Sequence, residues 1–232
     1  SNTSTPLQPE IATGFAPKPE VHAQSWVVAT ANPLATRAGY DVLKAGGSAV
    51  DAAIATSAAL AVIYPHIVGV GGDAFWLIHE AKTGEVHFLN GGGRAAASAS
   101  ADYFTSRGMK EIPFRGILSA SLTTPGSVDS WCEAHAKYGK LPLARNLQSA
   151  ITYARDGFPV TERLAGWIAK TEQELRAEPD AAAIFLKDGV PKTGSLLRNP
   201  GLATTLESIG KDGRHGFYDG PVAEALANYV QQ

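Results

Sequence analysis

The sequence has little cysteine and no excess of charge of either sign. Cys132 is the single cysteine of the 232 residues, so the chain contains no internal disulfide. Its cysteine usage leaves a cytoplasmic and a periplasmic location equally open. The 20 Lys and Arg are scattered along the chain and are slightly outnumbered by 22 Asp and Glu. This balance argues against a nucleic-acid partner.

A long hydrophobic run is also missing. The apolar run over residues 52–63 is rich in small side chains and is shorter than the roughly 20 residues that a membrane helix needs, so we expect no membrane span. Residues 1–25 contain several Pro, Ser and Thr with little periodicity and are predicted to be a disordered tail. No signal-peptide pattern is present, which is compatible with earlier removal of a targeting segment. Residues 26–232 are predicted to form one domain.

The chain is arranged around residues 49–78. The first half is a run of Ala with Val, Ile and Leu, which predicts a helix buried on nearly every side, with Ser48 as its N-cap. Pro65 ends this helix, and the glycines of residues 69–72 lead into a strand over Ala74–Ile78. Both alternating sets of side chains in this strand are apolar, so we expect it to be covered on both faces.

The glycine cluster at residues 69–72 is not typical of a phosphate site. Phosphate-binding loops lie between a strand and the N-terminus of a helix, whose free amides hold the anion. Here a helix comes first and a strand follows. We therefore interpret the cluster as a tight turn between packed elements.

Several shorter signals predict the remaining elements. Trp26–Thr30 is predicted to be a short strand, and Asn32-Pro33 a helix start. Glu85–Leu89 is expected to return from a turn at residues 81–84 as the second strand of a hairpin. Further helices are predicted near residues 101–104 and after Ser127, Pro142, Thr161, Pro179, Asn199 and Pro221.

Two arrangements of histidines are candidates for reactive sites. If Glu80 pairs with Glu85, His79 and His87 point to opposite faces of the hairpin and share no metal. Because the chain also has no Cys pair, we expect no metal site and no organic cofactor. Cys132 and His135 lie three residues apart on a predicted helix, but a nucleophilic dyad also needs a cleft and an orienting third group, so ordinary packing is favoured.

The best candidate ligand site is Asn90-Gly91-Gly92-Gly93-Arg94. Three glycines allow a backbone to approach a ligand closely, and an arginine beside them binds a carboxylate or phosphate through two hydrogen bonds. We therefore predict that Asn90, Gly92, Gly93 and Arg94 bind substrate. The alternative is a flexible surface loop with a solvated arginine.

Several segments, taken together, resemble the γ-glutamyltranspeptidase family in their order and spacing. They cover nearly everything after Trp26 and are Val28–Ala35, Ala45–Ala53, Pro65-His66 with Gly69–Phe75, Thr124–Val128, Tyr138-Gly139 with Leu141–Leu143, Ala154–Phe158 and Phe217–Gly220. The resemblance implies an α/β fold, the four-layer αββα sandwich of the N-terminal-nucleophile hydrolases, of which this chain supplies part.

The resemblance also implies an enzyme whose precursor cleaves itself into a large and a small subunit. The N-terminal threonine of the small subunit attacks an amide carbonyl, and its own α-amine acts as the base. By resemblance this chain is the first part of the large subunit, ends before that subunit does and carries no catalytic residue. Its expected partners are the small subunit and a small amide substrate bearing a carboxylate.

One position departs from the family pattern. The family binds the α-carboxylate of a γ-glutamyl group with an arginine just after the second hairpin strand, and that position falls on Gly92, with Arg94 the nearest arginine. In this respect the chain is more similar to the acylase and amidohydrolase branches, such as oxamate amidohydrolase. The alternatives are a true γ-glutamyltransferase or glutathione hydrolase, and a non-catalytic module that binds an anion.

Overall fold

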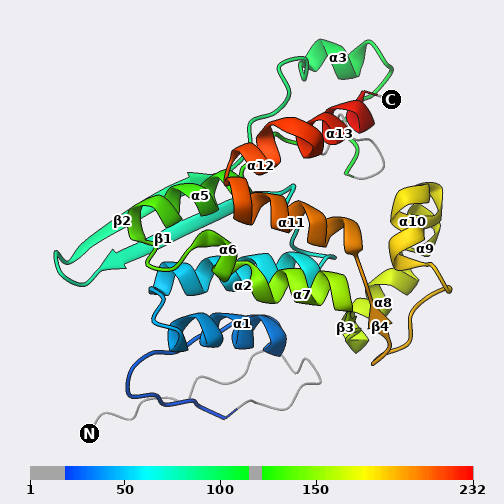
Figure 1. Cartoon of the computed structure of the whole chain (residues 1–232). Helices are drawn as coiled ribbons and strands as arrows, with labels where there is room; N and C mark the ends of the chain where they lie inside the picture. Colours follow the sequence, from blue (N-terminus) through cyan, green and yellow to red (C-terminus); the bar gives the residue numbers. More distant parts are fainter. Residues whose placement is uncertain (1–18, 115–121, 232) are drawn as a thin grey trace, which may run out of the picture.

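The computed structural model describes residues 19–114 and 122–231, and most of the expected N-terminal tail lies outside these residues. Helices α1, α2, α7 and α11 are stacked beside one another, and a long hairpin of β1 and β2 extends from one end of the stack (Figure 1). The predicted α/β class is confirmed. The strand predicted at Trp26–Thr30 is wrong, because this segment has no strand partner within the described residues.

The two N-terminal helices begin where their capping residues predict. Helix α1 spans Pro33–Lys44, and the side chain of Asn32 accepts a hydrogen bond of 2.9 Å from the amide of Leu34. Helix α2 spans Ala49–Ile63 after the N-cap Ser48. Most of its residues are buried, including Ile54 and Ala58 with no exposed surface, so the prediction of a core helix is confirmed. Its many alanines let neighbouring helices approach closely on several sides.

Asp51 in the first turn of α2 is fully buried and ties the helix to a distant loop. Its carboxylate accepts hydrogen bonds from the amides of Ser48 at 2.9 Å, Lys140 at 2.8 Å and Leu141 at 3.1 Å, and from Nδ2 of Asn146 at 2.7 Å. Burial raises the pKa of Asp51, but these hydrogen bonds outweigh it, so the pKa lies below its ordinary value of 3.8. The ionised carboxylate is therefore a structural group of the core.

The hairpin has the predicted register but not the predicted cover. Strand β1 spans Ala74–Glu80 and β2 spans Glu85–Gly91, with Glu80 opposite Glu85. The inner face, which carries Trp76 and Ile78, packs against the core. The outer face is exposed, so the expectation of cover on both faces is wrong for the described residues. Its side chains are Phe75 at 65%, Leu77 at 78%, Val86 at 59% and Phe88 at 66% exposure.

Helix α5 spans Ser127–Tyr138 and packs against the hairpin and α2 (Figure 1). Trp131 is fully buried, and its Nε1 donates a 3.1 Å hydrogen bond to Oγ of Ser57. The predicted cap is displaced by one residue. Gly126 is the N-cap without a side-chain hydrogen bond, and Ser127 is the first helical residue.

Among the described residues, no helix combines the length and hydrophobicity required to span a membrane.

The other elements complete the helical layers and form an arm that carries α3. A single helix was predicted from Pro142 to Gly157, but the structure divides it into α6 and α7. The bounds of these elements are α3 Ala101–Thr105, α6 Leu143–Asn146, α7 Gln148–Asp156, β3 Phe158–Pro159, α8 Glu162–Lys170, α9 Glu172–Ala177, α10 Pro179–Phe185, β4 Leu196–Leu197, α11 Pro200–Asp212, α12 His215–Tyr218 and α13 Gly220–Val230.

Candidate functional site

At the base of the hairpin, Gly91 and Gly93 lie very close to neighbouring parts of the chain. An added Cβ on Gly91 would lie 2.5 Å from the carbonyl oxygen of Ala74 and 2.7 Å from Cβ of Ser130. On Gly93 it would overlap the carbonyl oxygen of Thr124. Since neither glycine has a positive φ angle, the close approach of neighbouring backbone, rather than an unusual backbone conformation, explains why glycine is needed at both positions.

Hydrogen bonds hold the predicted ligand loop in place. The amide of Gly93 donates to Oδ1 of Asp73 at 2.8 Å, and the amide of Gly92 donates to Oδ1 of Asn90 at 2.9 Å. The carbonyl of Arg94 accepts from the amide of Thr124 at 2.9 Å. These contacts give the loop a defined path and do not fit the alternative of a flexible surface loop.

A second set of hydrogen bonds joins the segment before β1 to the start of α5, next to the same loop. The carbonyl of Gly72 accepts from the amides of Gly126 at 3.1 Å and Ser127 at 2.9 Å. Nε1 of Trp76 on β1 donates a 2.9 Å hydrogen bond to Oγ of Ser130 on α5. The start of β1, the end of β2 and the start of α5 therefore form one connected base under the loop.

Arg94 is the charged group that this base presents. Its side chain is exposed, and no described residue forms a hydrogen bond or an ion pair with its guanidinium group. Of the predicted site residues, Gly92 and Gly93 are held through their amides by the side chains of Asn90 and Asp73, and Arg94 comes directly after them. Such an arrangement can bind an anion by charge-assisted hydrogen bonds, while the side-chain oxygen Oδ1 of Asn90 already accepts from the amide of Gly92.

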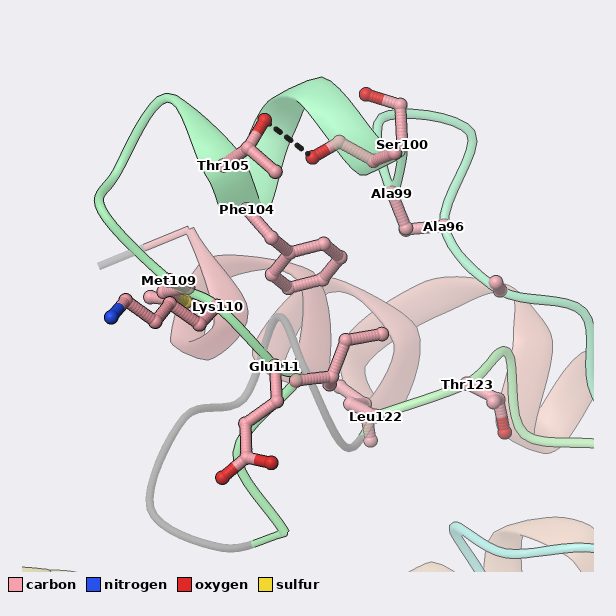
Figure 2. Close-up of a pocket in the computed structure, with 13 residues that line it drawn as sticks. Ala96, Ala99, Ser100, Phe104, Thr105, Met109, Lys110, Glu111, Leu122 and Thr123 are labelled. Carbon is pink, nitrogen blue, oxygen red and sulfur yellow. Dashed lines mark hydrogen bonds between the residues drawn. The ribbon is translucent and has the colours of Figure 1, made fainter.

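A hollow of about 450 Å³ begins one residue beyond Arg94, on the arm that carries α3 (Figure 2). The ring of Phe104 points into it from α3, and Lys110 points away from it (Figure 2). Its lining is mainly apolar, including Ala95, Ala96 and Leu122. The sequence reasoning missed this hollow, although the run of small residues after Arg94 is a signal that space would be left there.

Cys132 and His135 do not form a nucleophilic dyad. Burial raises the pKa of the Cys132 thiol, which disfavours the reactive thiolate. Nε2 of His135 instead lies 2.7 Å from the carbonyl oxygen of Leu141, and this ring nitrogen is therefore the donor. The packing interpretation of this pair agrees with both observations.

The hairpin histidines lie on opposite faces, as predicted, but a local ligand set was overlooked. His87 shares its face with Glu80 and Glu85, and one donor atom from each of these three residues lies within 4.8 Å of the others. The expectation of no metal site did not take this set into account. It considered His and Cys pairs and left out carboxylates on the same face of the paired strands.

Comparison with known proteins places most of the chain in one family. The profile of the family described as Gamma-glutamyltranspeptidase matches residues 35–232. The chain is 40% identical over 206 residues to the "Glutathione hydrolase-like YwrD proenzyme" of Bacillus subtilis, covering 88% of this chain and 39% of that protein. It is 42% identical over 200 residues to the "Oxamate amidohydrolase proenzyme" of Klebsiella pneumoniae, covering 84% of this chain and 37% of that protein.

A solved structure agrees with this assignment. The γ-glutamyltranspeptidase of Helicobacter pylori superposes with a TM-score of 0.85 at 30% identity, covering 92% of this chain and 62% of that one. The chain spans about two fifths of the length of the two curated relatives.

Proposed function

Because the chain belongs to the γ-glutamyltranspeptidase family, we propose that it is part of the large subunit of a self-processing amidohydrolase or acyltransferase. Its substrate is a small amide that bears a carboxylate. Supporting this reading, one relative is named as an oxamate amidohydrolase, and both curated relatives are named as proenzymes. Residues 26–232 supply the large-subunit portion of the domain, and the nucleophile belongs to the small subunit.

The proposed chemistry follows the pattern of N-terminal nucleophiles. The hydroxyl oxygen of the small subunit's N-terminal threonine attacks the amide carbonyl, and the threonine's own α-amine takes the hydroxyl proton. The tetrahedral intermediate expels the amine of the substrate, which receives that proton, and leaves an acyl ester on the threonine. Water or a second amine then attacks the ester and releases the acyl group. This chain's part is to bind and orient the acyl group.

The proposal rests chiefly on the position of Arg94 and on its free guanidinium group. Arg94 follows directly on a loop whose backbone path is fixed by the contacts of Gly93 with Asp73 and Thr124. Its guanidinium group has no partner among the described residues and is exposed. An arginine whose backbone is held and whose guanidinium group is free in this way suits a planar carboxylate, which accepts two parallel hydrogen bonds. We therefore assign carboxylate binding to Arg94, with Asn90, Gly92 and Gly93 shaping the loop.

The outer face of the hairpin is the proposed contact for the small subunit. Phe75, Leu77, Val86 and Phe88 lie on one face of β1 and β2, since Leu77 is opposite Phe88 and His79 is opposite Val86. An apolar face of this kind on a two-stranded hairpin is unstable in water and is normally buried. Because the curated relatives are about two and a half times longer than their matched part, the remaining part of the precursor is the natural cover.

A γ-glutamyl substrate is the second candidate. It is favoured by the name of the B. subtilis relative, a glutathione hydrolase-like protein. The two candidates differ in where the carboxylate lies. An oxamate-like acyl group carries its carboxylate next to the scissile amide, whereas a γ-glutamyl group carries it at the far end of the acyl chain, so the reach of Arg94 distinguishes them.

The test compares four amides on the complete, processed enzyme and on its Arg94→Ala variant: oxamate, a glutaryl amide, glutathione and a γ-glutamyl anilide. Loss of a charge-assisted bidentate contact is worth about 1.5–3 kcal/mol, or roughly ten- to hundredfold in binding. We expect Arg94→Ala to raise KM for oxamate by this factor and to leave self-cleavage intact, as seen by mass spectrometry.

Arg107→Ala is the matched control. It removes a second positive charge from the same arm, but the Arg107 guanidinium stacks on Tyr103 at 3.7 Å and donates to its carbonyl oxygen, so its KM should be unchanged. Efficient glutathione turnover that is unaffected by Arg94→Ala would show that both the substrate and the role of Arg94 are wrong. An unprocessed precursor without amidase activity would contradict the enzyme proposal itself.

A further inference from the structure

Three potential metal ligands lie on the inner face of the hairpin, at its turn end. Glu80 and Glu85 are the last opposed pair of β1 and β2, and His87 is two residues beyond Glu85 on the same strand. Directly opposed residues and residues two apart share one face of a sheet, so the pairing itself places the three side chains together. Their positions thus come from regular strands and not from an irregular loop.

The separations between the donor atoms fit a small divalent ion. Nε2 of His87 lies 3.3 Å from Oε2 of Glu80 and 3.6 Å from Oε2 of Glu85. Two ligand atoms held about 2.1 Å from a tetrahedral zinc ion are about 3.4 Å apart. Both observed separations are close to that edge, and all three donors lie within 4.8 Å of one another.

The charges of the cluster also favour a cation. Two carboxylates directly across a strand pair repel one another and weaken the pairing. In the part of the chain that the structure describes, neither Glu80 nor Glu85 forms an ion pair with a Lys or Arg side chain. A neutral imidazole donates one proton and cannot balance both carboxylates. A divalent ion would neutralise both and would keep His87 as a neutral ligand.

The position of the cluster leaves it accessible from solvent. The exposure of the side chains is 30% for His87, 37% for Glu80 and 67% for Glu85, so an ion can enter and retain bound water. The ring of His87 lies beside Tyr138 of α5, with 6.1 Å between ring centroids. The cluster lies on the hairpin face opposite Phe75, Leu77 and Phe88. Binding of the small subunit to that outer face would therefore leave the cluster accessible.

We propose that Glu80, Glu85 and His87 form a zinc-type site for a first-row divalent ion, with water completing the coordination. One imidazole and two carboxylates suit Zn²⁺ and Mn²⁺, and the affinity should follow the usual order of these metals. The ion would link β1 to β2 at the turn end of the hairpin. It takes no part in the amide chemistry, so this inference stands independently of the proposed function.

The test is calorimetric titration of Zn²⁺ into the complete enzyme, prepared without an affinity tag and freed of metal with a chelator. We expect one equivalent to bind with saturation. His87→Ala and the pair Glu80→Gln with Glu85→Gln should each weaken binding by tenfold or more. Co²⁺ in place of Zn²⁺ should give visible absorption bands that are absent from His87→Ala.

His79→Ala is the matched control, because it removes the other hairpin histidine from the opposite face. It should bind one equivalent as tightly as the parent enzyme. The inference is overturned if no saturable binding is seen, if His87→Ala binds Zn²⁺ as well as the parent does, or if binding is lost with His79→Ala instead. In the first of these cases the three side chains only contact one another and hold no ion.

Discussion

Asp51 shows how one side chain determines the position of distant backbone. It caps its own helix through Ser48 and accepts from the amides of Lys140 and Leu141, nearly 90 residues further along the chain. A carboxylate is suited to this role because it offers several acceptor positions and no donor. One of the segments that resemble the family contains Asp51, but the sequence pattern by itself indicated only the helix cap.

The first prediction at this scale concerns Asp51→Asn in the complete enzyme. The variant turns amide N–H groups toward buried donors, and we expect a loss of about 2 kcal/mol or more in the free energy of unfolding. Urea unfolding at pH 7 measures it. Asp41→Asn, a partly exposed residue paired with Arg37, is the control and should change stability little. Equal effects of the two substitutions would contradict the role given to Asp51.

The same residue determines a pH dependence. Because the pKa of Asp51 is lower in the folded protein than its ordinary value of 3.8, its contribution is complete above that value. It is lost as the pH falls below 3.8 and through the folded pKa, since protonation then removes the favoured acceptor. The parent enzyme should therefore lose more stability over this acid range than Asp51→Asn does.

At the scale of elements, the glycine junction under Arg94 connects structure to the proposed site. We predict that Gly93→Ala destabilises the complete enzyme by about 1–3 kcal/mol, because the new methyl group overlaps backbone that cannot rotate away. KM for the carboxylate substrate should rise as the loop shifts. Gly71→Ala is the control, since nothing lies within 4 Å of its added Cβ. Unchanged KM and stability in Gly93→Ala would show that the loop path tolerates the shift.

The elements that could be predicted from sequence are those whose signals are local. Asn32, Ser48 and Thr161 cap helices by bonding to amides two or three residues away, and all three helix starts were predicted correctly. The strand at Trp26–Thr30 was wrong because a strand depends on a partner that sequence pattern does not identify. The glycine run with Arg94 was visible, whereas the contact of Asp73 with Gly93 joins residues 20 apart and was not.

At the scale of the whole molecule, the fold predicted from the resemblance is confirmed. The chain superposes on a γ-glutamyltranspeptidase over 92% of its length, and the N-terminal-nucleophile hydrolase assignment follows. The described residues show helices on one side of the hairpin and bare apolar side chains on the other. The apolar pattern on both faces predicted a strand buried on both sides, and among the described residues the structure shows one covered on one side only.

The prediction at this scale is that the 232-residue chain made alone self-associates and binds a hydrophobic dye. Leu77→Glu with Phe88→Glu should reduce both effects and should impair self-cleavage of the complete precursor. Ile67→Glu, which replaces a comparably exposed apolar side chain elsewhere, should do neither. Light scattering and dye fluorescence measure the outcome. A monodisperse chain that binds no dye would contradict the claim that the outer face drives self-association.

The apolar character of both hairpin faces has a consequence for how the strands find their alignment. A strand with one polar face is penalised for slipping by one residue, since its apolar side chains would turn to water. Here a slip exchanges one apolar set for another and carries little such penalty. Gly91 supplies the missing discrimination, because a slip that moves Asn90 into its place would drive a Cβ to within 2.5 Å of the carbonyl oxygen of Ala74. A slip in this direction is thus excluded by the absence of a side chain at one position, whereas a slip in the opposite direction brings Gly92 there and meets no such barrier.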